Sequence, residues 1–293
     1  MNARRPAGVL AAITTPFDSA TGDVALGPLQ RNAATLLASG LDGIVACGST
    51  GEAPALEPDE QRRVVGALRQ LVPERCWLIA GGGAESTRQA AALAAAAARE
   101  GADAILVRPP AYFAAATTPA TLRDYYRAIA DASPVPILVY NIPKYTHLSL
   151  EPGMLEELAS HENIVGVKDS SGDRTGLAAY RDAVPRWSVL VGSGSLFSAA
   201  LELGCNGAVL GVACFVPALC AEIYAAFQSG ERARAGPLQQ RLELLHQEIV
   251  GRLGPAGVKV AMDAVGLYGG PCRAPLAPLL PAERARVARL LAA

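Results

Sequence analysis

The chain alternates short apolar runs with longer amphipathic stretches. Eight apolar runs end in turn residues, and we predict that each is a buried strand: Gly8–Phe17, Gly43–Gly48, Trp77–Gly81, Ala104–Val107, Pro136–Tyr140, Ile164–Lys168, Ser188–Gly192 and Gly207–Cys214. Five stretches between them have helical spacing: Leu26–Ser39, Pro58–Leu71, Ser86–Glu100, Pro119–Ala132 and Leu150–Ser160. Strands that alternate with helices of this length form right-handed βαβ units, and therefore a parallel sheet.

The number of these units indicates the architecture. Eight units close a (β/α)8 TIM barrel, whereas a doubly wound sheet more often has fewer strands and a Gly-rich nucleotide fingerprint after the first strand, which is missing here. From about Pro217 the pattern is helical, over Cys220–Gln228, Pro237–Arg252, Val258–Val265 and Pro281–Leu291. We therefore predict an α/β protein with a catalytic barrel over residues 1–217. A C-terminal helical region, residues 218–293, includes the last barrel helix.

Composition narrows the class of ligand. A formal net charge of -1 and a charged fraction of 18% leave no basic stripe, so nucleic acid and anionic membranes are poor partners and a small molecule is expected. The six cysteines are scattered without a C-x-x-C pair, and we find neither a secretory segment nor an apolar run long enough to span a membrane. A cytoplasmic protein is the expectation. The three histidines are widely spaced, so we expect no metal and no cofactor.

Polar residues gather where the predicted strands end, which is where (β/α)8 enzymes carry their active sites. The turn Gly48–Gly51 offers backbone N–H groups together with the hydroxyls of Ser49 and Thr50. Such a turn can hold a small carboxylate. The alternative is an ordinary βα turn in which a hydroxyl caps the next helix.

One lysine, Lys168, ends the sixth apolar run. Period-two alternation places it on the same face as Ile164 and Gly166, with Asp169 on the opposite face. A lysine forced into a barrel interior is driven toward its neutral form, which attacks a carbonyl to make a Schiff base. The alternative is a lysine whose head reaches solvent. Tyr140, at the end of the fifth run, is either a proton shuttle beside this lysine or an amphipathic ring with its hydroxyl in water.

Five segments together resemble the pyruvate-dependent Schiff-base lyases and aldolases, the family of dihydrodipicolinate synthase and N-acetylneuraminate lyase. They are Thr14–Phe17, Gly48–Glu52, Pro110–Phe113, Tyr140–Pro143 and Gly166–Asp173, and the likeness extends over nearly the whole chain. The resemblance implies a lysine–pyruvate imine that acts as an electron sink, with no metal required.

The resemblance also assigns roles to individual residues. Lys168 would be the Schiff-base lysine and Tyr140 the proton shuttle, while Ser49 and Tyr112 would complete a hydroxyl relay. The residues expected to bind substrate are Gly48, Thr50, Val209, Gly192 and Tyr145. Because the family counterpart of Tyr112 reaches across a dimer contact, the resemblance implies a homotetramer built from tight dimers.

Departures from the family pattern bear on the second substrate. Dihydrodipicolinate synthases usually carry an arginine five residues after the strand-five tyrosine, where this chain has Tyr145. Lys144 could replace that arginine as a less directional charge. Arg108 is another possible carboxylate clamp, although an ion pair with no catalytic duty is the simpler interpretation.

Two further stretches, Ala80–Thr87 and Tyr268–Leu276, are similar to 4-hydroxy-2-oxoglutarate aldolases, which cleave their substrate to pyruvate and glyoxylate. We therefore rank that aldolase first. The second is 4-hydroxy-tetrahydrodipicolinate synthase, which condenses pyruvate with aspartate semialdehyde, and a sugar-acid aldolase or dehydratase also stays open. Outside enzymology, the alternative is a non-catalytic ligand-binding barrel. The joint presence of Lys168, Tyr140, Ser49, Thr50 and Tyr112 argues against it, since a scaffold needs none of them.

Overall fold

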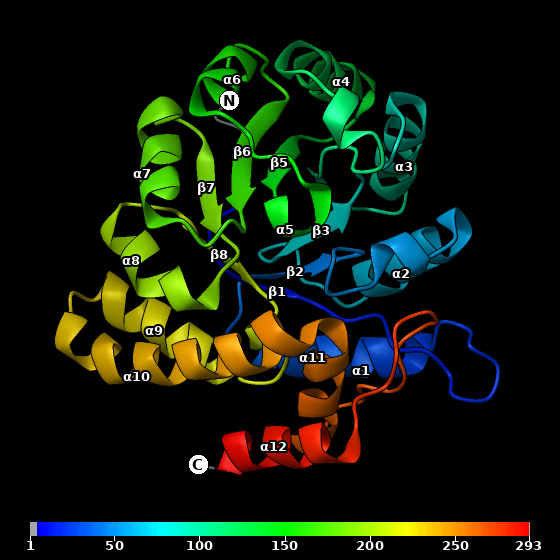
Figure 1. Cartoon of the computed structure of the whole chain (residues 1–293), viewed down its shortest axis with the longest axis vertical. Helices are drawn as coiled ribbons and strands as arrows, with labels where there is room; N and C mark the ends of the chain where they lie inside the picture. The colour runs from blue at the N-terminus through cyan, green and yellow to red at the C-terminus, as the bar shows by residue number, and fades with distance from the viewer. Residues whose placement is uncertain (1–4, 293) are drawn as a thin grey trace.

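Eight parallel strands close into a barrel at the centre of the computed structural model, which describes residues 5–292 (Figure 1). They are β1 Gly8–Ala12, β2 Gly43–Ala46, β3 Trp77–Gly81, β4 Ala104–Val107, β5 Ile137–Asn141, β6 Ile164–Asp169, β7 Ser188–Val191 and β8 Gly207–Leu210. Each strand pairs with its neighbours in sequence, and β1 pairs with β8 to complete the ring. The prediction of a (β/α)8 barrel is confirmed. The first and last strands are shorter than predicted, because the chain leaves the sheet after Ala12 and after Leu210.

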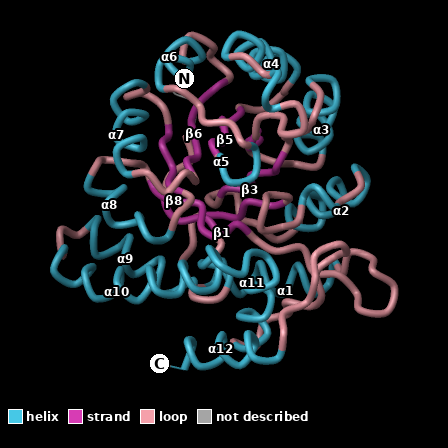
Figure 2. The backbone as a smooth tube through the Cα atoms, in the orientation of Figure 1, coloured by secondary structure: helices cyan, strands magenta, loops and turns pink. Residues whose placement is uncertain are grey.

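Helices surround the barrel on its outer side (Figure 2). They are α1 Leu26–Ala38, α2 Pro58–Arg69, α3 Thr87–Arg99, α4 Pro119–Ala132, α6 Pro152–Leu158, α7 Arg174–Ala183, α8 Phe197–Glu202 and α9 Pro217–Gln228. Their N-termini follow local rules: Ser86 accepts a hydrogen bond from the Gln89 N–H at the start of α3, and Thr118 forms a capping box with Thr121 at the start of α4. The short α5 Pro143–Thr146 lies instead inside this ring, over the strands (Figure 2). The sequence pattern predicted no helix over α5, α7 or α8.

The apolar residues form two layers, one inside the barrel and one between the strands and the helices. Leu10, Leu138, Leu190 and Val209 belong to the inner layer. The alanine-rich α3 belongs to the outer layer, where small side chains such as Ala90 and Ala94 allow the helix to lie close to the sheet. Both layers leave the carboxyl ends of the strands free to carry polar residues.

The C-terminal region consists of α10 Arg232–Leu245, a π-helix over His246–Gly251, α11 Arg252–Ala264 and α12 Pro281–Ala292 (Figure 1). The predicted start of α10 at Pro237 is five residues late, because the helix includes this proline in its interior. Within α11, Gly254 has non-helical angles (φ 59°, ψ -149°). The predicted division at residue 217 falls at the first residue of α9. Within residues 5–292, no helix combines the length and apolar character needed to cross a membrane.

Candidate active site

A cavity of about 240 Å³ opens at the carboxyl ends of the strands. Seven residues predicted from the sequence line it: Ser49, Thr50, Tyr140, Tyr145, Lys168, Gly192 and Val209. They come from β5, β6, β8 and the segments that follow β2, β5 and β7, so residues up to 160 positions apart share one site. The rule that barrel enzymes place polar residues at this end of the strands therefore agrees with the position of this cavity.

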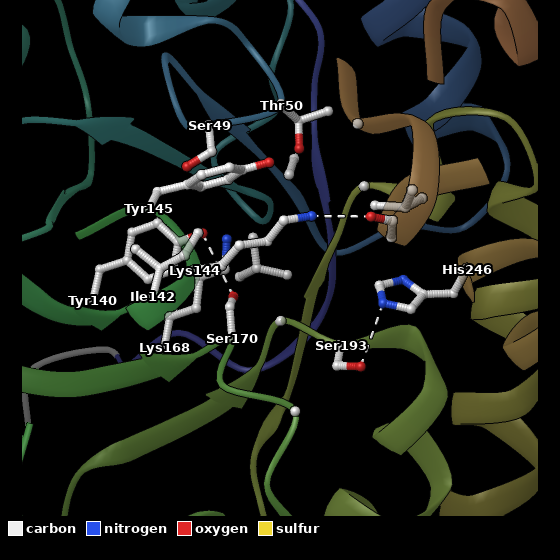
Figure 3. A pocket seen from close by; sticks show the side chains of 18 of the residues that line it. Ser49, Thr50, Tyr140, Ile142, Lys144, Tyr145, Lys168, Ser170, Ser193 and His246 are labelled. Atoms are coloured by element: carbon white, nitrogen blue, oxygen red, sulfur yellow. Dashed lines mark hydrogen bonds between the residues drawn. The ribbon is translucent and has the colours of Figure 1, made fainter. Parts of the chain in front are cut away.

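Lys168 and Tyr140 are partners on adjacent strands, β6 and β5. Both are 5% exposed, and the Lys168 Nζ lies 4.2 Å from the centre of the Tyr140 ring (Figure 3). Asp169 points to the opposite face, as alternation predicted, where it accepts hydrogen bonds from Asn141 Nδ2 at 2.7 Å and Ser171 Oγ at 2.8 Å. Burial raises the pKa of this carboxyl. The amine thus faces the cavity, while the neighbouring carboxylate is bound within the wall.

The turn after β2 has an unusual backbone that brings Ser49 and Thr50 to the cavity. Cys47 and Glu52, on either side of these residues, both have left-handed angles, with φ of 52° and 56°. Such angles are uncommon for residues other than glycine. The hydroxyl of Thr15 donates to the carbonyl of Gly51 at 2.7 Å, which holds the turn against the loop after β1. Burial raises the pKa of the Cys47 thiol to about 12, so this cysteine is a packing residue and not a nucleophile.

Two predicted site residues lie outside the cavity. Gly48 borders a neighbouring hollow of about 640 Å³, which shares Ser49, Tyr140 and Tyr145 with the cavity. Tyr112 borders neither space and is 82% exposed. The structure of one chain therefore does not bring Tyr112 to Lys168.

The loop that carries Tyr112 is nevertheless held firmly. The backbone N–H groups of Ala111 and Tyr112 both donate to Glu85 Oε2 at 2.9 Å, and the other oxygen of Glu85 pairs with Arg108 at 2.9 Å. Burial acts to raise the pKa of Glu85, but the two backbone donors and Arg108 outweigh it, so the pKa is lowered. Arg108 is thus part of an ion pair, as the simpler interpretation predicted.

The charged groups that line the cavity are cationic. Lys144 and Lys168 are both lining residues, and the described residues around the cavity include no aspartate and no glutamate. The Lys144 Nζ donates to the carbonyl of Gly251 in the π-helix at 2.9 Å (Figure 3). A cavity with this lining favours anionic molecules.

Sequence reasoning missed four polar residues of the cavity wall, Ser170, Ser171, Ser193 and His246. Ser170 Oγ donates to Tyr140 Oη at 3.5 Å, and His246 Nε2 lies 3.4 Å from Ser193 Oγ (Figure 3). The Gly194 N–H donates to His246 Nδ1, so in the neutral ring Nε2 carries the proton and donates to the serine. His246 lies in a long helical stretch of the sequence, and no local motif there indicated a role in the site.

The fold and the cavity define a class of protein: a (β/α)8 barrel that presents a buried lysine beside a tyrosine at the ends of adjacent strands. Residues 5–293 match the Dihydrodipicolinate synthetase family, and the chain belongs to this family. The family predicted from the sequence is therefore confirmed. The chain is a lyase of the Schiff-base-forming, class I aldolase type.

Relatives resemble the chain over its full length. A 4-hydroxy-tetrahydrodipicolinate synthase of Acidiphilium cryptum is 36% identical over 281 residues, which cover 96% of this chain and 95% of the relative. The crystal structure of a dihydrodipicolinate synthase from Bacillus anthracis matches with a TM-score of 0.94 at 28% identity and covers 99% of both chains. The structure of a chloride-inhibited dihydrodipicolinate synthase from Acinetobacter baumannii, complexed with pyruvate, matches with a TM-score of 0.92 at 32% identity and covers 98% of both.

Proposed function

We propose that Lys168 forms an imine with pyruvate and that this chain makes or cleaves a carbon–carbon bond through that imine. The observation that carries the proposal is the burial of the Lys168 amine beside the Tyr140 ring, at the end of the barrel where polar residues converge. In this reaction the neutral amine attacks the keto carbon of pyruvate, the carbonyl oxygen leaves as water, and a C–N double bond forms. Loss of a proton from the methyl group then gives an enamine, whose carbon attacks an aldehyde.

The remaining predicted residues have distinct duties in this proposal. Tyr140 and Ser49 transfer protons as the carbonyl oxygen leaves and as the new hydroxyl forms. Thr50 and the backbone near Gly48 hold the pyruvate carboxylate, and Gly192 and Val209 shape the cavity around its methyl group. A relative's structure complexed with pyruvate supports this choice of oxo acid.

The second substrate is an aldehyde that carries a carboxylate. Support comes from the cavity lining, in which Lys144 supplies a cation and no described lining residue is acidic. Since the relatives at 33–37% identity include several named 4-hydroxy-tetrahydrodipicolinate synthase, aspartate semialdehyde becomes the first choice, which reverses the ranking made from the sequence. The reaction is then the condensation of that aldehyde with pyruvate.

The second candidate is a 4-hydroxy-2-oxoglutarate aldolase, for which the aldehyde is glyoxylate. One observation favours it: Tyr145 occupies the position where we expected an arginine in a synthase, and its ring lies beside Ser49 and Thr50 in the cavity (Figure 3). A phenol cannot form the bidentate ion pair that an arginine makes with a carboxylate, so the contact by which synthases usually bind aspartate semialdehyde is absent.

We further propose that the active protein is a homotetramer of tight dimers in which Tyr112 enters the partner's site. Tyr112 and Phe113 are 82% and 69% exposed, and their rings pack edge to face with centres 4.9 Å apart. Two exposed aromatic rings on a loop fixed by Glu85 form a pre-organised apolar contact. A tyrosine that lies outside its own chain's cavity can then complete a partner's hydroxyl relay.

The first experiment is borohydride reduction in the presence of pyruvate, followed by intact-protein mass spectrometry and peptide mapping. We expect one reduced pyruvyl adduct, on Lys168, and none in Lys168→Ala. Lys144→Met is the matched control, because Lys144 lines the same cavity and should leave the adduct intact. Absence of the adduct in folded wild-type protein would contradict the proposal and favour a non-catalytic barrel.

A screen of aldehydes then separates the candidates. Aspartate semialdehyde and glyoxylate carry a carboxylate, whereas glyceraldehyde is uncharged. Preference for glyceraldehyde, or release of water without carbon–carbon cleavage, would favour the sugar-acid aldolase or dehydratase over both anionic choices.

A further inference from the structure

Glu52 ends the turn that carries Ser49 and Thr50, and its side chain is completely buried. Its backbone has left-handed angles (φ 56°, ψ 36°), so the side chain leaves the turn in a direction that a helical or extended residue could not give it. A buried carboxylate is retained only where cations or donors compensate for lost hydration. The partners of Glu52 therefore indicate what this part of the turn is attached to.

Both oxygens of Glu52 contact the C-terminal region. Oε1 lies 2.5 Å from the Nζ of Lys259 in α11, which is 1% exposed, and Oε2 accepts a hydrogen bond from the backbone N–H of Arg273 at 2.9 Å. The same ammonium donates to the carbonyl of Pro271 at 2.7 Å. One carboxylate thus joins the turn after β2 to α11 and to the segment that follows it.

That segment, residues 268–273, is itself fastened to the barrel, and we call it the strap. Tyr268 exchanges two hydrogen bonds with the side chain of Asn32 in α1, at 2.7 and 3.0 Å. The Arg273 guanidinium donates to both oxygens of Glu60 in α2, at 2.6 and 2.7 Å. Because these attachments do not involve the turn, the strap offers Glu52 a fixed point.

Lys259 is held in place as well. Its Nζ lies 4.4 Å from the centre of the Phe17 ring, and the Arg273 guanidinium lies 4.3 Å from the same centre. Phe17 is 1% exposed, so this cation–π contact is shielded from water. A buried ion pair is not an efficient means of stabilisation, because removing two charges from water costs about as much as their attraction returns. We therefore attribute to this ion pair a role in fixing the direction of the Glu52 side chain and not a gain in stability.

We propose that Glu52 and Lys259 are positioning residues that set the geometry of the Ser49–Thr50 turn, and through it the affinity for the carboxylate of the 2-oxo acid. The inference rests on the proposed function, since it assumes that this turn holds pyruvate. It assigns the C-terminal region a role in substrate affinity although neither residue touches substrate. Small displacements of a binding group are costly, because hydrogen bonds to a carboxylate depend on direction.

The test measures how trapping of the Lys168 adduct depends on pyruvate concentration. In Glu52→Gln we expect the half-saturating concentration to rise about tenfold, while turnover at saturating pyruvate stays within about twofold of wild type. Glu222→Gln is the matched control, because it removes a carboxylate that pairs with Arg234 but no contact to the turn or to the strap, and it should leave the half-saturating concentration unchanged.

The double variant Glu52→Gln/Lys259→Met covers the case in which Glu52→Gln fails to fold around an unpaired lysine. It removes both charges and leaves similar volumes, so it should fold, and it should still need about tenfold more pyruvate because the ion pair with Lys259 that directs the turn is gone. Wild-type half-saturation in this folded variant would overturn the inference. Absence of any adduct in the wild type would instead overturn the proposed function, so the two failures are distinguishable.

Discussion

In the proposed function, Lys144 is the residue placed for the second substrate. Its ammonium lies in the cavity wall and donates to the carbonyl of Gly251, a neutral partner that a substrate carboxylate can replace. A hydrogen bond to a charged group contributes more than one to a neutral group, so the exchange favours binding. The π-helix thus holds the lysine where an anionic aldehyde would bind.

Lys144→Met should weaken binding of anionic aldehydes only. We expect the half-saturating concentration of aspartate semialdehyde or glyoxylate to rise about 10- to 100-fold, since a charged hydrogen bond contributes about 1.5–3 kcal/mol. Steady-state kinetics with each aldehyde measure this, with Lys144→Arg as the charge-conserving control. An equal loss with glyceraldehyde would show that Lys144 acts on the shape of the cavity and not on charge.

His246 makes the stability of the folded protein depend on pH. Burial lowers the pKa of this ring from 6.5 to about 4, and the ammonium of Lys144 acts in the same direction. Ser193 and the Gly194 N–H are its other polar neighbours. Between these pH values the unfolded chain binds more protons than the folded one, so stability falls as pH falls from about 6.5 to 4.

We expect this histidine to remove on the order of 1–3 kcal/mol of unfolding free energy between about pH 7 and pH 4. Urea denaturation at several pH values measures it. His246→Gln removes the titrating ring and should flatten the curve in that window, whereas His147→Gln, on an exposed loop, should not. If the unfolding free energy of wild type and of His246→Gln changed equally with pH, His246 would not be the cause of the dependence.

Among the elements, the close approach of β3 to the turn after β2 positions the site. A Cβ added to Gly81 would lie 1.9 Å from the carbonyl oxygen of Cys47, far inside a permitted contact. The turn can therefore approach β3 only because residue 81 has no side chain. Gly81, Gly48 and Ser49 all line the neighbouring hollow, so this close contact forms part of its wall.

Gly81→Ala should displace this turn and destabilise the protein by about 1–3 kcal/mol, the usual cost of overpacking. Gly153→Ala in α6 is the matched control, because no atom lies within 4 Å of the added carbon, and its effect should stay within about 1 kcal/mol. Chemical denaturation measures both. Unchanged stability of Gly81→Ala would mean that the β2 turn moves freely, which would also weaken the positioning argument for Glu52.

The helices and strands that depend on short stretches of sequence were predicted best. The eight strands follow from apolar runs, and the capped α3 and α4 follow from helical spacing. α8 has only 6 residues, and so few turns give too little periodicity to recognise. α7 has 10 residues, more than the predicted α6, and it was missed although Leu177 and Tyr180 are spaced as on one face of a helix. The start of α10 was misplaced because a proline is typical of a helix start, while packing against α9 retains Pro237 inside the helix.

For the molecule as a whole, a complete site requires a second copy of the chain if Tyr112 acts in trans. Lys168→Ala and Tyr112→Phe should each lose most activity, about 10²–10⁴-fold for a positioned acid–base group. In a hybrid dimer, one site combines the intact Lys168 of one chain with the intact Tyr112 of the other. Mixing the two variants under exchange conditions should therefore restore activity.

The measurement is the activity of the subunit-exchanged mixture against each variant alone. Lys168→Ala mixed with Tyr140→Phe is the matched control, because both residues line the cavity of a single chain. Every site of that hybrid keeps one of the two defects, so the control mixture should recover no activity. No recovery in the Tyr112 mixture either would place that tyrosine in its own subunit's chemistry.

The barrel and the placement of Lys168 and Tyr140 at neighbouring strand ends followed from the sequence alone, because they depend on short-range patterns: alternation within a strand and polar residues at its end. The family followed from the resemblance of five segments of the sequence. Tertiary structure was needed to show that His246 and Ser193 share a wall, that Lys144 contacts the π-helix, and that Lys259 is buried against Glu52. These contacts join residues 53, 107 and 207 positions apart. No local pattern specifies such pairs, because their energies depend on the closed barrel that brings them together.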